Sequence, residues 1–498
     1  MKKTVTVLSI AALAATAAGC GGGSDAGSSS SPAPSSATAA TSGPKPELRQ
    51  LNQFDRYDAT KEAPAKWITE RTGYTVKYDL LPAENADEKL NLLMANKEPY
   101  DLMKLNKNQF SKLVSSGALE PLDDLIAKYG KNLKQAIAPE SWEAVKVNGK
   151  IYAIPEASSG NLVNFELAVR QDILDELGLK VPTTRDELYT VLKTIKEKKG
   201  IIPLTGGKDP FIGDIASTFG LSTQWEDNGG TLRNYVENPA MKEYLTFMNK
   251  LYKEGLMDPE WGINTGAKAI EKLSSGKAAM YRVAYYDGGN LNNALLKNFP
   301  NAKMTLIPFL KDANGKNKVV ATTGVSWFIS IPKFAPHKDD ALKLIDAKLE
   351  KDTFKGLAIG QEGVHHEVKD GKYYPIQPKF ADEWANASAF VTGVDQNVYP
   401  TYWQARVRKD PYVQSYFETI QENAKPALVI DPLTFAPPLD NISKNSQKLA
   451  KLVEDSFLKF ISGSEPMSNY DAFVANWKAQ GGDEMTKEAN DWYKANKK

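Results

Sequence analysis

Two periodicities of hydrophobic and polar positions alternate along the chain from residue 47 onward. Segments in which β-branched and aromatic residues alternate with polar ones predict strands, and segments with apolar residues at helical spacing predict helices. In chain order these are a strand at 47–54, a helix at 63–73, a strand at 74–82, a helix at 85–98 and a strand at 100–105. Strands that alternate with helices are typical of a parallel α/β sheet.

The rest of the chain continues in this mixed pattern. The stretch 145–155 predicts a hairpin, because Asn148-Gly149 tolerates positive φ at both central positions. Segment 303–332 predicts a strand, an Asn-Gly turn and two further strands. Helices are predicted twice within 170–200, at 238–255, at 337–350 and over most of the chain beyond 440.

The amino terminus has a different order: charged, then apolar, then small residues. Lys2-Lys3 precede an apolar run, Val5–Ala18, that is too short to span about 30 Å of hydrocarbon. This order is typical of a secretory signal peptide. Its end, Ala18-Gly19-Cys20, resembles the lipobox of bacterial lipoproteins. That resemblance implies a signal peptide at 1–19 and a lipid, with diacylglyceryl and palmitate chains, on Cys20.

Residues 20–46 consist mainly of Gly, Ser, Ala and Pro after the cysteine. Such a segment lacks the apolar side chains that would offset the entropy of ordering, so we expect a disordered tether. The folded body is then expected on the extracellular side of the cell membrane, held by the lipid anchor.

Composition excludes several classes of function. A net charge of +1 lacks the basic excess of nucleic-acid binders, so no nucleic-acid partner is expected. Cys20 is the only cysteine, which rules out an internal disulfide, cysteine-based zinc and iron–sulfur clusters. With only three histidines, a histidine-based zinc site is poorly supplied. We expect no metal and no cofactor.

Three short motifs favour structural roles over chemistry. In "GQEGVHHEV" the adjacent His365 and His366 have neither zincin spacing nor a common face on a strand, which favours a structural or ligand-facing turn over a metal site. "TGGKDP" (205–210) lacks the first glycine and the Ser or Thr of a P-loop. "KDANGK" (311–316) lacks the downstream acid of a calcium loop and favours a hairpin turn.

Aromatic residues gather with planar polar residues in several loop-like stretches. A sugar ring stacks an apolar face on an aromatic ring, and its hydroxyls bond to amides, carboxylates and guanidinium groups. A single tryptophan is more often core than ligand, but several such clusters favour carbohydrate binding. They lie at 223–230, 258–262, 280–290, 324–327 and 398–403.

Several motifs occur in the order found in one family. "RTGYTVKY", "EKLNLLMANKEPYDLMKLN", "LVSSGALEPLDDLIAKYG", "GKIYAIP", "LAVRQDILDELGLKVPTTRDEL", "SSGKAAM" and "GQEGVHH" follow one another along nearly all of 47–498. Together they resemble the extracellular solute-binding proteins (family 1) of ABC sugar importers, in the large lipoprotein branch related to alginate-oligosaccharide binders.

The resemblance implies a type II periplasmic-binding-protein-like fold. Two discontinuous α/β lobes would enclose a ligand cleft and close on it by a hinge motion. The N-terminal lobe is expected at 47–160 plus about 320–365, and the C-terminal lobe at about 161–319 plus 366–498.

It also implies candidate ligand residues in the loops that follow the matched motifs. Aromatic rings would stack on sugar, Asn108, Glu156 and Asp287 would bond to hydroxyls, and Arg282 would pair with a sugar acid or two hydroxyls. The residues carried over are Asn106, Asn108, Glu156, Arg282, Tyr285, Tyr286 and Asp287, and we add Trp225, Trp327 and Trp403 as further candidates for stacking.

One departure bears on calcium. Alginate-binding relatives carry an Asp/Asn-rich calcium loop where this chain has "KTIKEKKGIIPLTGG" (193–207), so no calcium is expected there. The sequence thus predicts a monomeric, lipid-anchored protein that captures an oligosaccharide and delivers it to ABC permease subunits without chemistry. A surface-anchored glycosidase or lyase is the alternative, and an anchored adhesion or scaffold module is a third.

Overall fold

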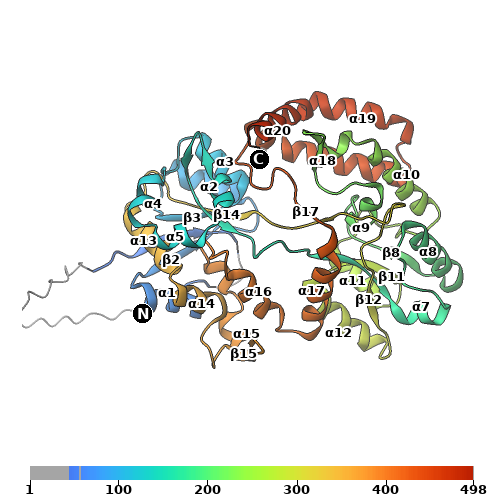
Figure 1. Ribbon diagram of the computed structural model, residues 1–498, viewed down its shortest axis with the longest axis horizontal. Coiled ribbons are helices and arrows are strands. Elements are labelled where there is room, and N and C mark those ends of the chain that lie inside the picture. Colours follow the sequence, from blue (N-terminus) through green and yellow to red (C-terminus); the bar gives the residue numbers. More distant parts are fainter. Residues whose placement is uncertain (1–43, 55–57, 497–498) are drawn as a thin grey trace, which may run out of the picture. The chain divides into compact units, whose positions relative to one another are not determined.

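The computed structural model describes residues 44–54 and 58–496, and one compact unit begins at Lys45 (Figure 1). The predicted signal peptide, Cys20 and the tether up to residue 43 lie outside the described residues. In the part of the chain that is described, no helix is both long and apolar enough to cross a membrane.

The first sheet contains five strands in the order β2-β1-β3-β14-β6. Strands β1, β2 and β3 are parallel to one another as predicted, while β14 arrives from far along the chain and pairs antiparallel with both β3 and β6. The strands are β1 (Leu48–Asn52), β2 (Val76–Leu80), β3 (Leu102–Leu105), β6 (Ile154–Ala157) and β14 (Val325–Ser330).

The second sheet contains four strands in the order β12-β7-β11-β8. Its central pair β7 and β11 is antiparallel, and β8 lies parallel to β11 at one edge. The strands are β7 (Phe165–Arg170), β8 (Ile202–Thr205), β11 (Ala278–Ala284) and β12 (Met304–Leu306). Two sheets with separate hydrophobic cores make two α/β lobes, as expected.

Helices surround both sheets (Figure 1). Those of the first lobe include α1 (Ala63–Thr72), α2 (Ala86–Ala95), α3 (Lys107–Ser115), α13 (Lys338–Lys348), α14 (Lys351–Ile359) and α16 (Tyr399–Val407). Those of the second include α7 (Gln171–Leu177), α8 (Arg185–Lys199), α10 (Pro239–Lys253), α11 (Gly266–Ser274), α12 (Gly288–Asn298), α17 (Pro411–Ala424), α18 (Asp440–Ser462), α19 (Tyr470–Trp477) and α20 (Asp483–Asn496).

Local turn chemistry sets several of these bounds. Helix α1 ends where Gly73 adopts a left-handed φ of 71°, which glycine tolerates without a Cβ clash. The predicted hairpin forms as β4 (Lys146–Val147) and β5 (Lys150–Ile151), with φ of 51° and 76° at Asn148 and Gly149. The hairpin expected around Asn314-Gly315 is wrong. Strand β12 pairs with β7, and β13 (Val319–Val320) pairs with β17 (Leu428–Val429).

The chain passes between the lobes after β6, after β12 and after α16. A bridge joins Leu162 to Thr322, and β13 lies beside β17. The predicted lobe division at 366 stays a prediction, but Phe390, Tyr399 and Tyr402 belong to the core of the first sheet. We therefore propose that the first lobe extends to about residue 406.

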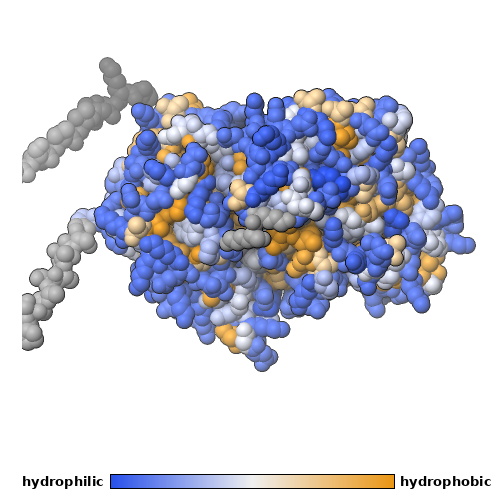
Figure 2. Space-filling view, turned by 45° about the horizontal axis from the view of Figure 1, so that its top comes forward, coloured by the Kyte–Doolittle hydropathy of each residue, from blue (hydrophilic) through white to orange (hydrophobic). Residues whose placement is uncertain are grey.

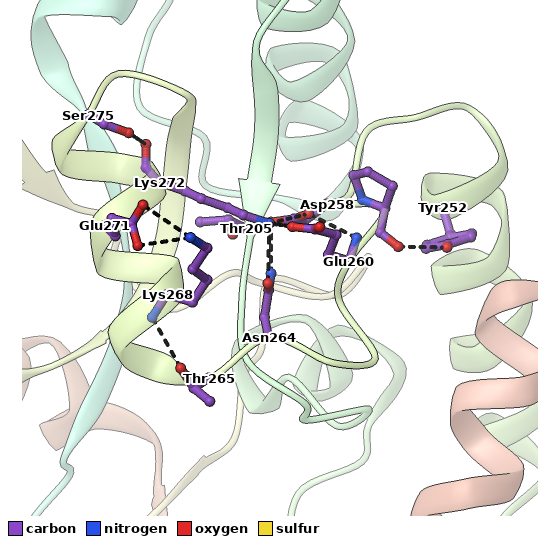
Figure 3. A network of polar contacts seen from close by, with 11 residues as sticks. Thr205, Tyr252, Asp258, Glu260, Asn264, Thr265, Lys268, Glu271, Lys272 and Ser275 are labelled. Carbon is purple, nitrogen blue, oxygen red and sulfur yellow. Dashed lines mark hydrogen bonds and ion pairs between the residues drawn. The ribbon is translucent and has the colours of Figure 1, made fainter.

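The second lobe contains a buried ion pair, drawn in Figure 3. Lys272 reaches from α11 and places its Nζ 2.9 and 2.8 Å from the two carboxylate oxygens of Asp258. The same Nζ lies 2.6 Å from Glu260 Oε2 and 3.2 Å from Asn264 Oδ1. The Asp258 carboxylate also accepts hydrogen bonds from Thr205 Oγ1 and Asn264 Nδ2. This network connects strand β8, helix α11 and the loop between α10 and α11.

Candidate functional site

A cavity of about 390 Å³ lies between the two lobes, and residues of both lobes line it. This is within the usual range for small-ligand sites, about 300–1,000 Å³. The first lobe provides ends of β1, β3, β6 and β14, and the second provides the turn after β11. The lining residues are Asn52, Gln53, Phe54, Lys104, Glu156, Ala157, Ser158, Ser159, Leu162, Asn164, Tyr285, Tyr286, Thr322, Ser326, Trp327, Ser388, Ala389, Tyr399 and Trp403.

Half of the predicted ligand residues come together in this cavity: Glu156, Tyr285, Tyr286, Trp327 and Trp403. Glu156 and Trp327 are paired across β6 and β14, so the strand register places them side by side. The rings of Tyr285 and Tyr286 meet at 5.2 Å, nearly edge to face, and Tyr286 is 53% exposed. Aromatic surface of this kind suits the apolar face of a sugar. Hydrophobic patches also interrupt the mainly hydrophilic surface on the face that Figure 2 shows.

A buried ion pair forms the floor of the cavity. Lys104 Nζ lies 2.9 and 2.8 Å from the two oxygens of Glu156, and both residues are less than a tenth exposed. Burial raises the pKa of Glu156, and the contact with Lys104 opposes that rise. Behind the pair lies the ammonium of Lys348, the last residue of α13, which is 2% exposed.

Asn52 and Lys104 line the cavity but were not predicted as ligand residues. Asn52 ends β1, and Lys104 is the third residue of the four-residue strand β3. Ligands of open α/β sheets bind at the carboxyl ends of strands. A lysine within the otherwise apolar strand "LMKL" was the available signal. Among the described residues, Asn52 Nδ2 is buried without a hydrogen-bond partner, so it can donate to a ligand.

The other predicted residues lie elsewhere, and their ligand roles stay predictions. Arg282 lines a separate cavity of about 250 Å³, where its Nε donates to the buried Asp214. Trp225 is 3% exposed and packs in the core of the second lobe. Asn106 caps α3 through the Gln109 amide, Asn108 lines a third cavity, and Asp287 precedes α12 outside the main cavity's lining.

A second buried carboxyl lies near Arg282, on strand β7. Glu166 is fully buried and accepts hydrogen bonds from Asn423 Nδ2 at 3.0 and 3.2 Å. Burial, together with the negative charge of Asp214, raises its pKa to about 9. Folding therefore holds a proton on this carboxyl at neutral pH that the unfolded chain releases.

Glu166→Gln is therefore expected to stabilise the protein at alkaline pH. The folded pKa lies above the unfolded one. The stability that the Glu166 proton contributes is full below about pH 4.5 and is lost as pH rises towards 9. Glutamine needs no proton, so urea unfolding at pH 8 should give the variant about 1–3 kcal/mol more stability than the wild type, and little difference at pH 4.5. The exposed Glu422→Gln serves as the control, and a variant less stable at pH 8 would contradict this account.

The histidine pair occupies a structural turn. His365 Nδ1 accepts a hydrogen bond from the Gln361 amide, and its Nε2 lies 3.1 Å from Glu383. In the described ranges, no group of three or more His, Cys, Asp or Glu residues is placed to hold a metal ion.

The sequence is similar to those of known binding proteins. The profile of the family described as bacterial extracellular solute-binding protein matches residues 53–352, which is more than half of the chain. Lipoprotein LipO of Bacillus subtilis (strain 168) is 28% identical over 88% of this chain and 90% of its own. The polygalacturonan/rhamnogalacturonan-binding protein YtcQ of the same organism is 26% identical over 70% of this chain and 71% of its own.

Two solved structures share the fold. The alginate-binding protein AlgQ2, without calcium ion, superposes with a TM-score of 0.68 at 18% identity over 90% of this chain and 98% of its own. The Streptococcus pneumoniae ABC-transporter substrate-binding protein FusA, in complex with kestose, has the same TM-score and identity over 90% of this chain and 99% of its own. The predicted two-lobed fold, and the prediction of a binding protein rather than an enzyme, are confirmed. The chain belongs to the bacterial extracellular solute-binding proteins.

Proposed function

We propose that this protein captures an oligosaccharide in the cavity between its lobes and delivers it intact to an ABC-transporter permease. The observation that carries the proposal is the composition of the cavity. Tyr285 and Tyr286 in the turn after β11, Trp327 in β14 and Trp403 in α16 border one space, and buried polar groups lie at its floor. Rings that stack on sugar faces, combined with a few fixed polar groups, are what a carbohydrate site requires.

The names of similar proteins support the carbohydrate and transport parts of this proposal. YtcQ is named for binding polygalacturonan and rhamnogalacturonan, and the FusA structure holds kestose. A hinge at the stretches that cross between the lobes would let them close around the ligand. This closure needs no side chain that transfers a proton or forms a covalent bond.

The lipid anchor is a further part of the proposal. The charged, apolar and small residues that end at Cys20, and the name of the relative LipO, both support a lipoprotein. The protein would then act as a monomer on the outer face of the cell membrane, on a tether formed by residues 20–46.

A thermal-shift screen of the purified full chain tests the function. The panel contains neutral and uronic oligosaccharides of two to five residues, each with and without calcium. A ligand present at 100 times its Kd should add about 2.7 kcal/mol of stability and raise the melting temperature. A sharp response to one glycan class, unaffected by calcium, is expected. No response across the panel would overturn the proposed ligand class.

A further inference from the structure

Two lysine ammoniums lie behind one wall of the cavity. Lys104 Nζ donates to the carbonyl of Val391 at 3.2 Å, and Lys348 Nζ donates to the carbonyl of the preceding residue, Phe390. The same stretch lines the cavity through Ser388 and Ala389. The two ammoniums are therefore held on consecutive carbonyls of a segment that borders the ligand space.

These two cations face one anion. Glu156 is the only carboxylate among the described residues within 4.0 Å of Lys104 Nζ, and none lies that close to Lys348 Nζ. A buried charge without a counter-ion is unfavourable. Burial and the neighbouring Lys104 accordingly lower the pKa of Lys348 to about 7, despite the opposing charge of Glu156. Among the described residues, two lysine side chains beside the cavity thus share a single carboxylate.

A buried hydrogen-bond donor at the cavity is also unsatisfied. Asn52 Nδ2 is buried at the cavity and has no acceptor among the described residues. Lys104 also lines the cavity, and its ammonium is directed at the two oxygens of Glu156 and the carbonyl of Val391. Among the described residues, Glu156 is the acidic side chain that lines the space, and it is already engaged by Lys104. A ligand carboxylate would both accept a hydrogen bond and balance the positive charge. A sugar hydroxyl would accept a hydrogen bond but would leave the charge unbalanced.

We infer that the captured solute is an acidic oligosaccharide, whose carboxylate lies at the Asn52 and Lys104 side of the cavity with Lys348 as the balancing charge. This inference rests on the proposed function, since it specifies the class of oligosaccharide. Lys348 does not line the cavity and acts through its charge alone, as a specificity-determining residue.

Isothermal titration calorimetry of the purified full chain with matched pairs of oligosaccharides tests the inference. Each pair differs only in the carboxylate: α-1,4-linked trigalacturonate against its fully methyl-esterified form, and β-1,4-linked trimannuronate against its methyl ester. At least one free acid should bind 10-fold or more tightly than its ester at low salt, and this preference should shrink as salt increases. Equal or tighter binding of the esters would overturn the inference.

The variant Lys348→Met removes the surplus charge while keeping the length of the side chain. It should lower the acid-over-ester preference at least 5-fold. Lys343→Met, on the same helix but partly exposed and paired with Asp340, should leave the preference unchanged. An unchanged preference in Lys348→Met would also overturn the inference. Binding of neutral sugars alone would overturn the inference and leave the proposed function standing, while binding of no sugar would overturn both.

Discussion

Lys272→Met is expected to lower the free energy of unfolding by about 3–5 kcal/mol, because it leaves the carboxylate of Asp258 buried without its cation. Asp258 is fully buried, and its remaining donors are neutral groups such as Thr205 Oγ1 and Asn264 Nδ2. Burial by itself would raise the pKa of Asp258, but the hydrogen bonds from Lys272, Thr205, the Glu260 amide and Asn264 together outweigh it and hold the pKa below its usual range. Urea unfolding of wild type and variant at pH 7 measures the loss.

Lys268→Met is the matched control. Lys268 lies one turn earlier on α11 and pairs with Glu271 at the surface, where both side chains are about half exposed. Exposed pairs contribute about 0–1 kcal/mol, so this variant should unfold close to the wild type. A Lys272→Met protein that is as stable as Lys268→Met would show that the network in Figure 3 does not hold the second lobe together.

Trp403→Ala is expected to weaken binding of the captured oligosaccharide about 30-fold or more. Trp403 borders the cavity, and its ring lies 6.1 Å from that of Tyr399 in a nearly edge-to-face arrangement. Removal of a large aromatic anchor at the centre of a binding site costs about 2 kcal/mol or more. Titration calorimetry with the glycan identified by thermal shift gives the change in Kd.

Two further variants separate stacking from general loss of packing. Trp403→Phe keeps a ring and should recover part of the affinity. Trp492→Ala removes an equally large ring from the surface of the second-lobe core, away from the cavity lining, and should leave Kd unchanged. If Trp403→Ala bound as tightly as the wild type, the aromatic cavity would not be the ligand site.

Local chemistry made the elements of the first lobe predictable. Alternation along 74–82 and the glycine at 73 are properties of a few consecutive residues, and they set β2 and the end of α1. The pairing of 303–332 was not predictable in this way. Its strands pair with β7 and β17, which are distant in sequence, so the Asn-Gly turn between them connects two different sheets.

The candidate site was predictable in part for the same reason. Tyr285 and Tyr286 follow a motif that places them at the cleft, Trp403 belongs to an aromatic cluster, and the structure brings all three to one cavity. Arg282 precedes the two tyrosines by only a few residues, yet strand β11 directs it to Asp214, because the side of a strand on which a residue lies depends on register. Lys348 could not be identified from sequence, since its role depends on a contact with the carbonyl of Phe390.

The most direct test of the account is a calorimetric titration of the full chain with its best oligosaccharide, followed by mass spectrometry of the recovered glycan. The account predicts one saturable site per chain, and a bound glycan that leaves with its mass unchanged after prolonged incubation. Shortened or unsaturated products would contradict capture without chemistry, and the absence of saturable binding would contradict an oligosaccharide site in this cavity.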